Sequence, residues 1–114
     1  MKYLLLIHST EARRRFDVLS EVEQKEILDD YLAIGELPGV LGGHQLQPAD
    51  MTTTVRVEGG RTLTTDGPFI EMKEAVGGYL LFEADNLDAA IELAARIPAA
   101  RMGGAIEVRP VLER

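Results

Sequence analysis

One stretch of the chain concentrates side chains that could bind or transform a ligand. Residues 65–79 read Thr-Asp-Gly-Pro-Phe-Ile-Glu-Met-Lys-Glu-Ala-Val-Gly-Gly-Tyr. Asp66 could act as a general base or accept a hydrogen bond from a ligand, and Glu71, Lys73 and Tyr79 are candidate ligand contacts. Functional groups commonly gather on loops that a rigid scaffold holds in place. We therefore predict a small-molecule site near this loop.

The same loop also has a purely structural interpretation. A proline follows Gly67 and favours an extended backbone there, so the Asp66 carboxylate could simply cap the turn. Glu71, Lys73 and Glu74 could equally be solvated, or could pair with a second subunit. The residue types alone leave both interpretations open.

The only two histidines, His8 and His44, are the candidates for acid–base catalysis. An imidazole titrates near neutral pH, and each histidine lies near the end of a predicted strand, although either could be merely packed or solvated. Arg109 could hold a carboxylate ligand through two parallel hydrogen bonds or pair with a second subunit. Cysteine is absent and the histidine spacing matches no metal motif, so we predict neither a metal nor a cofactor.

Composition narrows the class of protein. The 114 residues include 12 basic and 19 acidic side chains, a net charge of −7, which opposes binding to a nucleic-acid backbone. No apolar run approaches the ~20 residues of a membrane span. The length predicts one domain over residues 1–114, and the lack of cysteine fits a reducing cytoplasm.

Hydrophobic patterns predict the order of the elements. Tyr3–Ile7 and Tyr79–Phe82 are continuous apolar runs typical of buried strands. Ser20 begins a capping box for one helix, and Asp85-Asn86 offers an N-cap for another. Further strands are predicted at residues 40–46, 52–57, 62–64 and 105–112. Loops are predicted at 9–19, which could contain a helical turn, and at 98–104. The predicted buried stripes are Ile27, Leu28, Tyr31, Leu32 and Ile34, then Leu87, Ala90, Ile91, Ala94 and Ile97.

This order predicts an α+β, ferredoxin-like split βαβ sheet with an inserted β-hairpin. The two continuous apolar runs should be central and adjacent, and the terminal strand should lie at an edge because Pro110 cannot donate to a ladder. Both faces of the central strands are apolar, yet the helices can cover only one of them. We therefore expect a second subunit to cover the other face in a two-fold homodimer.

Several motifs together resemble the YCII-related proteins of the DGPF type. They include Thr-Asp-Gly-Pro-Phe at 65–69, Gly-Gly-Tyr at 77–79, Ala-Arg-Ile-Pro-Ala-Ala-Arg at 95–101 and Glu-Val-Arg-Pro at 107–110. The resemblance covers nearly the whole chain. It implies a ferredoxin-like fold that forms a dimeric α/β barrel in the bacterial cytoplasm.

The resemblance brings no established reaction. YCII-like relatives have been suggested to be enzymes with a His-Asp pair, and DGPF members often lie beside genes for extracytoplasmic-function sigma factors. That family usually has an aromatic residue where His8 stands and often Glu where His44 stands, so the resemblance does not assign the pair here. Two functions follow: a dimer that binds a small molecule, or transforms it without a cofactor, near 66–69, or a regulatory partner in sigma-factor signalling.

Overall fold

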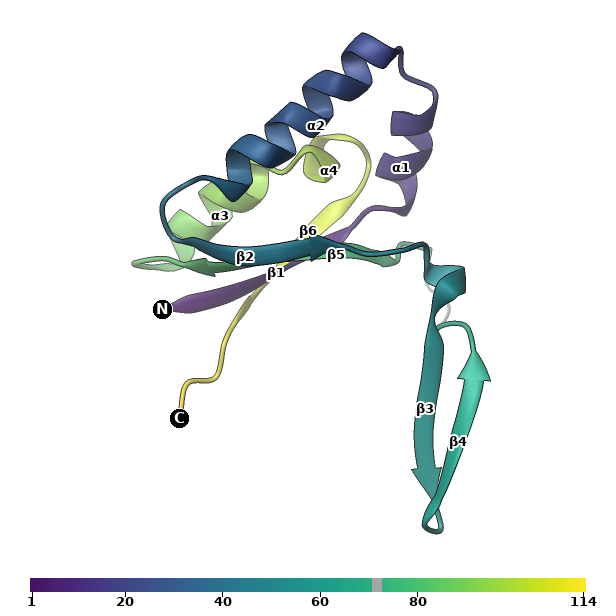
Figure 1. The fold of residues 1–114 in the computed structure, drawn as a ribbon. Helices are drawn as coiled ribbons and strands as arrows, with labels where there is room; N and C mark the ends of the chain where they lie inside the picture. The colour runs from purple at the N-terminus through teal and green to yellow at the C-terminus, as the bar shows by residue number, and fades with distance from the viewer. Residues whose placement is uncertain (71–72) are drawn as a thin grey trace.

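The structure, a computed structural model, describes residues 1–70 and 73–114. Its centre is an antiparallel sheet with the strand order β2-β5-β1-β6 (Figure 1). These strands are β1 (Lys2–His8), β2 (Val40–Gln45), β5 (Val76–Glu83) and β6 (Ala105–Pro110). The sequence correctly predicted that β1 and β5 are adjacent and central and that β6 lies at an edge. The connectivity is therefore that of the ferredoxin-like split βαβ sheet.

Four helices lie on one face of this sheet (Figure 1). They are α1 (Thr10–Asp17), α2 (Glu21–Gly35), α3 (Leu87–Arg96) and α4 (Pro98–Arg101). The predicted capping box of α2 is confirmed, since the Glu23 amide donates to Ser20 Oγ and the Ser20 amide donates to Glu23 Oε1, both at 3.2 Å. Asn86 caps α3 by accepting from the Ala89 amide at 3.0 Å. No helix in the described residues is long and apolar enough to cross a membrane.

Two segments that the sequence predicted as loops are helical. Residues 10–17 form α1 because their polar side chains support a helix from its surface: Glu11 accepts from Arg14 at 2.9 Å and from Arg15 at 3.2 Å. Residues 98–101 form α4, whose first residue is Pro98. Proline is well suited to the first position of a helix. Pro98 therefore not only follows the end of α3 but also begins a new helix.

The core lies between the sheet and the helices. Tyr3, Leu5 and Ile7 of β1 are buried there, with Ile34 of α2 and Leu93 of α3. The predicted helix stripes were partly wrong. On α2, Leu28 is 50% exposed and Leu32 is 70% exposed. On α3, Leu87 and Ile91 are each 49% exposed, whereas Leu93, which was not in the predicted stripe, is buried. Apolar residues occupy a wider arc of each helix than the sheet of a single chain can cover.

The opposite face of the sheet, here called the open face, has no helix over it (Figure 1). Alternation along β1 places Leu4 and Leu6 on this face, and both are only half-buried. The short 3₁₀ helix η1 (Ala49–Met51) leads from β2 to a hairpin of β3 (Thr53–Glu58) and β4 (Arg61–Asp66). This hairpin projects from the open-face side of the sheet (Figure 1). The radius of gyration, 16.0 Å, exceeds the ~13 Å of a compact chain of this size.

Candidate functional site

One row of side chains crosses the open face near the end of the sheet that bears the loop. Leu6 pairs directly with Tyr79 on β5 and with Glu107 on β6, and Tyr79 pairs with His44 on β2. Directly paired residues share a face of a sheet, so the row reads His44, Tyr79, Leu6, Glu107. His8 is the next β1 residue on the same face. Four strands therefore bring both histidines to one surface.

His8 and Glu107 form a hydrogen-bonded pair on this surface. The Nε2 atom of His8 contacts Oε1 of Glu107, diagonally across the β1–β6 ladder. The His8 side chain is only 9% exposed, whereas that of Glu107 is 57% exposed. The carboxylate thus satisfies a buried imidazole while it remains accessible to solvent or to a bound molecule. The pair therefore presents a carboxylate that a buried ring orients toward the open face.

His44 and Tyr79 form a second pair, on the other side of Leu6. The His44 Nδ1 and the Tyr79 hydroxyl oxygen are 2.8 Å apart, and the two rings are tilted at 51° with centroids 5.7 Å apart. A phenol and an imidazole in hydrogen-bond contact can relay a proton, because each ring nitrogen accepts or donates according to its tautomer. Two polar pairs therefore flank an apolar residue.

The spacing of the two pairs follows from the sheet. Tyr79 and Glu107 lie on strands that flank β1, two inter-strand spacings apart, which is roughly 10 Å. Leu6 forms the floor between them, and Leu4 continues that floor one step along β1. Arg109 lies opposite Leu4 on the same face and is exposed. A surface of this kind can hold a small molecule with an apolar body and polar groups at its ends.

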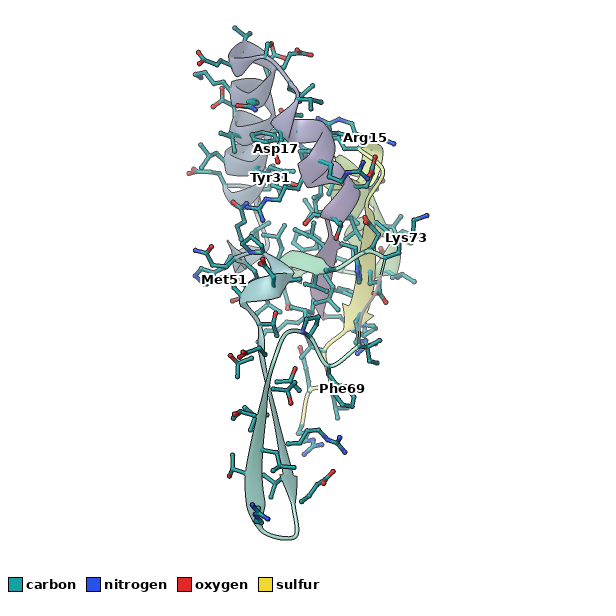
Figure 2. The ribbon with its side chains drawn as sticks, turned by 90° about the vertical axis from the view of Figure 1, so that its right-hand side faces the viewer. Arg15, Asp17, Tyr31, Met51, Phe69 and Lys73 are labelled. Atoms are coloured by element: carbon teal, nitrogen blue, oxygen red, sulfur yellow. The ribbon has the colours of Figure 1, made fainter. Side chains whose placement is uncertain are left out.

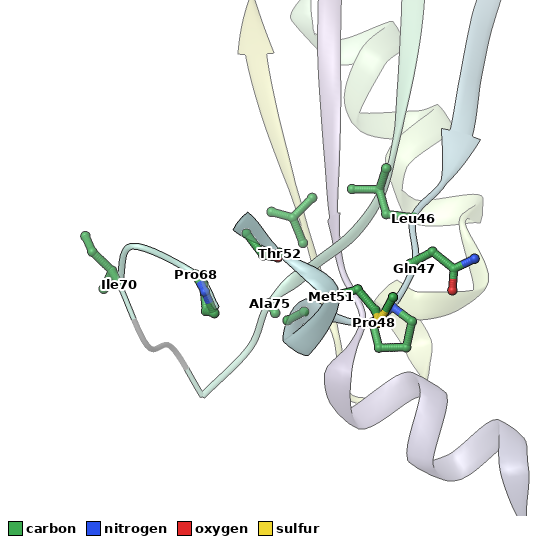
Figure 3. Close-up of a pocket in the computed structure, with 10 residues that line it drawn as sticks. Leu46, Gln47, Pro48, Met51, Thr52, Pro68, Ile70 and Ala75 are labelled. Carbon is green, nitrogen blue, oxygen red and sulfur yellow. The ribbon is translucent and has the colours of Figure 1, made fainter. Parts of the chain in front are cut away.

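A cavity of about 680 Å³ lies at the same end of the molecule (Figure 3). One side comes from the segment after β2, and Pro68 and Ile70 of the loop contribute from across it. Its lining is mainly apolar: Leu46, Gln47, Pro48, Ala49, Met51, Thr52, Pro68, Ile70, Ala75 and Val76. An open, mainly apolar cavity thus lies beside Pro68 and Ile70 of the loop.

The cavity and the polar row are neighbours through the sheet. Val76, which lines the cavity, pairs with His8 across the β1–β5 ladder. Leu46, another lining residue, follows Gln45 at the end of β2, two positions beyond His44. None of His8, His44, Asp66 or Arg109 lines the cavity itself. The titratable groups thus lie next to the apolar space rather than inside it.

Asp66 lies at the end of β4, opposite Thr53, and is exposed. Its carboxylate accepts no hydrogen bond from any other residue among 1–70 and 73–114. The turn that follows is held by other groups: the Gly67 amide donates to the Thr52 carbonyl, and the Thr54 hydroxyl donates to the Gly67 carbonyl, each at 2.7 Å. Gly67 has φ of +96°, a conformation that glycine adopts readily, rather than the extended backbone we expected.

The charged residues after the turn have separate positions. Glu74 accepts from the Glu11 amide at 3.1 Å in the first turn of α1, and the Thr10 hydroxyl oxygen accepts from the Ala75 amide at 2.9 Å. The carboxylate of Glu74 therefore serves as a helix cap, a role for which its charge is suited. Lys73 is exposed (Figure 2). Glu71 lies outside the described residues.

The structure brings four of the predicted site residues onto one face: His8, His44, Tyr79 and Arg109. It does not bring Asp66 or Lys73 into contact with either histidine. The sequence analysis missed Glu107 as the partner of His8, because these two residues lie 99 positions apart in the sequence. Within the described residues, no three His, Asp or Glu side chains gather as a potential metal site.

The fold and this row of side chains define a small α+β protein with a candidate proton-transfer surface on its sheet. The chain belongs to the YCII-related domain family, whose profile matches residues 1–114. A relative, an uncharacterized protein of Rhizobium meliloti (strain 1021), is 35% identical over 94 residues, which are 82% of this chain and 69% of the relative.

One solved structure is also similar. It is 5-chloro-2-hydroxyhydroquinone dehydrochlorinase from Burkholderia phenoliruptrix AC1100, in complex with 2,5-dihydroxybenzoquinone. The sequences are 17% identical, the match covers 100% of this chain and 96% of the other, and the TM-score is 0.48. A likeness at this level transfers neither ligand nor activity to this chain.

Proposed function

We propose that this protein is a homodimer of the DGPF type that binds a small organic molecule at the loop end of its sheet and moves a proton on it without a cofactor. The bacterial cytoplasm is the proposed compartment, on the resemblance alone. The observation that carries the proposed chemistry is the His8–Glu107 pair, in which a buried imidazole is bonded to an accessible carboxylate. A general base needs both proximity to its proton and a means of stabilising its charge.

The proposed roles follow from exposure and hydrogen bonding. The free carboxylate oxygen of Glu107 takes a proton from a C–H or O–H group of the bound molecule, and the contact with His8 shares the resulting change in charge. On the other side of Leu6, the Tyr79 hydroxyl donates to the oxygen on which negative charge develops. His44 then supplies a proton to Tyr79 if the hydroxyl gives up its own.

The cavity beside the loop supports the binding part of this proposal. Its apolar lining can hold the hydrophobic part of the molecule, and a few placed polar groups usually set orientation in such sites. Val76 links the cavity to His8 through the β1–β5 ladder. Arg109, farther along the open face, can hold an anionic group at the end of the molecule away from the cavity.

The composition of the open face supports the homodimer. The four sheet strands place four charged side chains on this face besides the histidines: Lys2, Glu83, Glu107 and Arg109. Two cations and two carboxylates sum to zero, although the whole chain carries −7. A two-fold interface presents the same patch on both subunits, so a neutral patch with an apolar centre avoids the repulsion that the net charge would cause elsewhere.

The proposed chemistry can be tested through the two imidazoles. Because His8 and His44 are the only histidines, their ring signals in ¹⁵N NMR spectra can be assigned with His8→Gln and His44→Gln. We expect phenols, enolisable carbonyl compounds or small carboxylic acids in a fragment library to shift one or both signals. Glu107→Gln should weaken this response at least tenfold in apparent affinity without unfolding the chain. A library that leaves both imidazoles unchanged in a folded dimer would instead favour the regulatory alternative.

A further inference from the structure

The hairpin of β3 and β4, called the arm below, lacks the support that a two-stranded element normally needs. Its twelve strand residues are exposed except for Thr54, which is half-buried. The arm extends from the side of the sheet that bears no helices (Figures 1 and 2). An isolated two-stranded hairpin is at best marginally stable in water. The arm is therefore expected to pack on something outside the single chain.

The two faces of the arm differ in charge. Directly paired residues share a face, so one face carries the pairs Arg56–Leu63 and Glu58–Arg61. Arg56 pairs with Glu58 at 2.9 Å and lies 5.6 Å from the centre of the Phe69 ring. This face carries three charged side chains, two of which pair with each other, and so suits solvent.

The other face, called the valine face, consists of Thr53, Val55, Val57, Thr62, Thr64 and Asp66. Asp66, at the base of the arm, is its only charged residue. Val55 and Val57 are 60% and 67% exposed, and β-branched residues of this kind stabilise sheets by packing against a neighbouring surface. The valine face is thus the one that a partner would cover.

The length of the arm fits a second copy of this chain as the partner. Each arm strand has six residues, which extend for roughly 20 Å at about 3.4 Å per residue. Two sheets packed face to face lie about 10 Å apart. The sheet of a second copy packed on the open face would therefore lie beside the first half of the arm. The second half of the arm would extend past that sheet, along the side of the second copy.

The charges of the arm fit the same partner. Arg56 and Arg61 balance Glu58 and Asp66, which gives a sum of zero. The four strands of the open face likewise carry two basic and two acidic side chains, and the Met1 ammonium lies 3.4 Å from Glu83 Oε1. An acidic or basic macromolecule would find no complementary field on either surface. A second copy of this chain, in contrast, presents the same balanced surface and meets little repulsion there.

We infer that the arm grips a second copy of this chain through the valine face, so that each subunit's hairpin is completed by the other. The inference rests on the proposed homodimer and adds the segment and the face that hold it together. It also gives Asp66 a location: at the base of the valine face, this carboxylate lies at the boundary between the two copies rather than within its own chain's polar row.

Photocrosslinking tests this inference. The chain has no cysteine, so Val57→Cys or Thr62→Cys accepts a single benzophenone–maleimide probe on the valine face. Protein that carries the probe is made at natural isotope abundance (¹⁴N) and is refolded with an excess of ¹⁵N protein that carries no probe. The dimer is then isolated and irradiated, and crosslinked peptides are identified by mass. We expect most crosslinks to join ¹⁴N arm peptides to ¹⁵N peptides. Leu63→Cys, on the charged face, should give at least threefold fewer such links.

A matched pair of variants supplies a second readout. Thr64→Glu adds a charge to the valine face, and Thr65→Glu adds the same charge one residue away on the opposite face. We expect Thr64→Glu to raise the dimer dissociation constant at least tenfold and Thr65→Glu to change it less than threefold. Dimers whose probes crosslink only to their own chain, or equal effects of the two glutamates, would overturn the inference yet leave the proposed dimer intact. A monomeric wild-type chain would overturn both.

Discussion

The Nδ1 atom of His44 lies 2.8 Å from the hydroxyl of Tyr79, its direct partner across the β2–β5 ladder. In the proposed function the Tyr79 hydroxyl donates to the bound molecule, so we expect the His44 imidazole to carry a proton on Nδ1 and to donate it to the hydroxyl oxygen. We expect Tyr79→Phe to release this constraint and to give a mixture of the two tautomers. The ¹⁵N shifts of the His44 ring measure the ratio directly.

The stability of Tyr79→Phe separates this role from a structural one. The pair is accessible to solvent, so loss of its hydrogen bond should cost no more than about 0.5–1.5 kcal/mol of unfolding free energy. The His8 ring signals should stay unchanged, because His8 bonds to Glu107 on the other side of β1. An unchanged His44 tautomer ratio would show that the hydroxyl does not hold the ring.

Gly43, next to His44, allows β2 to approach β5 closely. A Cβ at this position would collide with the Tyr79 carbonyl oxygen and with the Leu80 side chain. Gly43→Ala should therefore destabilise the chain by roughly 1–3 kcal/mol, as is usual for overpacking, and should displace the His44–Tyr79 contact. Gly35, at the end of α2, is the matched control because a Cβ there would meet nothing within 4 Å.

For Gly35→Ala we expect a neutral or stabilising effect, up to about 1 kcal/mol, since alanine restricts the unfolded chain. Urea unfolding of the two variants provides the comparison. Equal effects would show that the close approach of β2 and β5 tolerates an added methyl group.

Glu74 is predicted to stabilise α1 from outside the helix. Its carboxylate accepts from the Glu11 amide at 3.1 Å, and Ser9, the N-cap residue, makes no side-chain cap hydrogen bond. Glu74→Ala should reduce the unfolding free energy by about 0.5–2 kcal/mol, the range for lost caps. Lys73→Ala, at the exposed neighbouring position, should change it by less than about 0.5 kcal/mol. Similar losses in both variants would argue against a capping role.

Local sequence signals predicted most of the fold. The Ser20–Glu23 capping box and the Asn86 cap each involve residues only three positions apart. The strands at Tyr3–Ile7 and Tyr79–Phe82 were recognisable because each is a continuous apolar run. Pro110 correctly marked the edge strand. Errors arose at α1 and α4, whose local signals were read as loops, and α1 also receives a hydrogen-bond acceptor from Glu74, 63 residues from Glu11.

The candidate site was less predictable because it depends on register. His8 and Glu107 are 99 residues apart, and no local pattern states which β6 residue faces which β1 residue. A shift of one residue would turn Glu107 to the helix side of the sheet. The sequence could therefore name His8, His44, Tyr79 and Arg109 as candidates but could not pair them.

Tyr31, on α2, leads to a prediction about alkaline pH. Burial against the helices raises the pKa of its phenol above the ordinary value of 10.0, and this outweighs the opposing effects of the Ala99 backbone and of Arg101. A folded-state pKa above the unfolded value means that folding favours the neutral phenol. The corresponding stability is fully present below about pH 10 and is lost as the pH rises through the folded-state pKa.

Tyr31→Phe removes this titration while it keeps the ring. We therefore expect the unfolding free energy of the wild-type chain to fall relative to that of Tyr31→Phe between about pH 9 and pH 11, whereas the difference between them should be constant from pH 6 to pH 9. Urea unfolding at each pH gives both free energies, and comparison of the two proteins cancels the other groups that titrate at alkaline pH. A difference that stays constant to pH 11, or that grows in favour of the wild type, would contradict burial of a neutral phenol between α2 and α4.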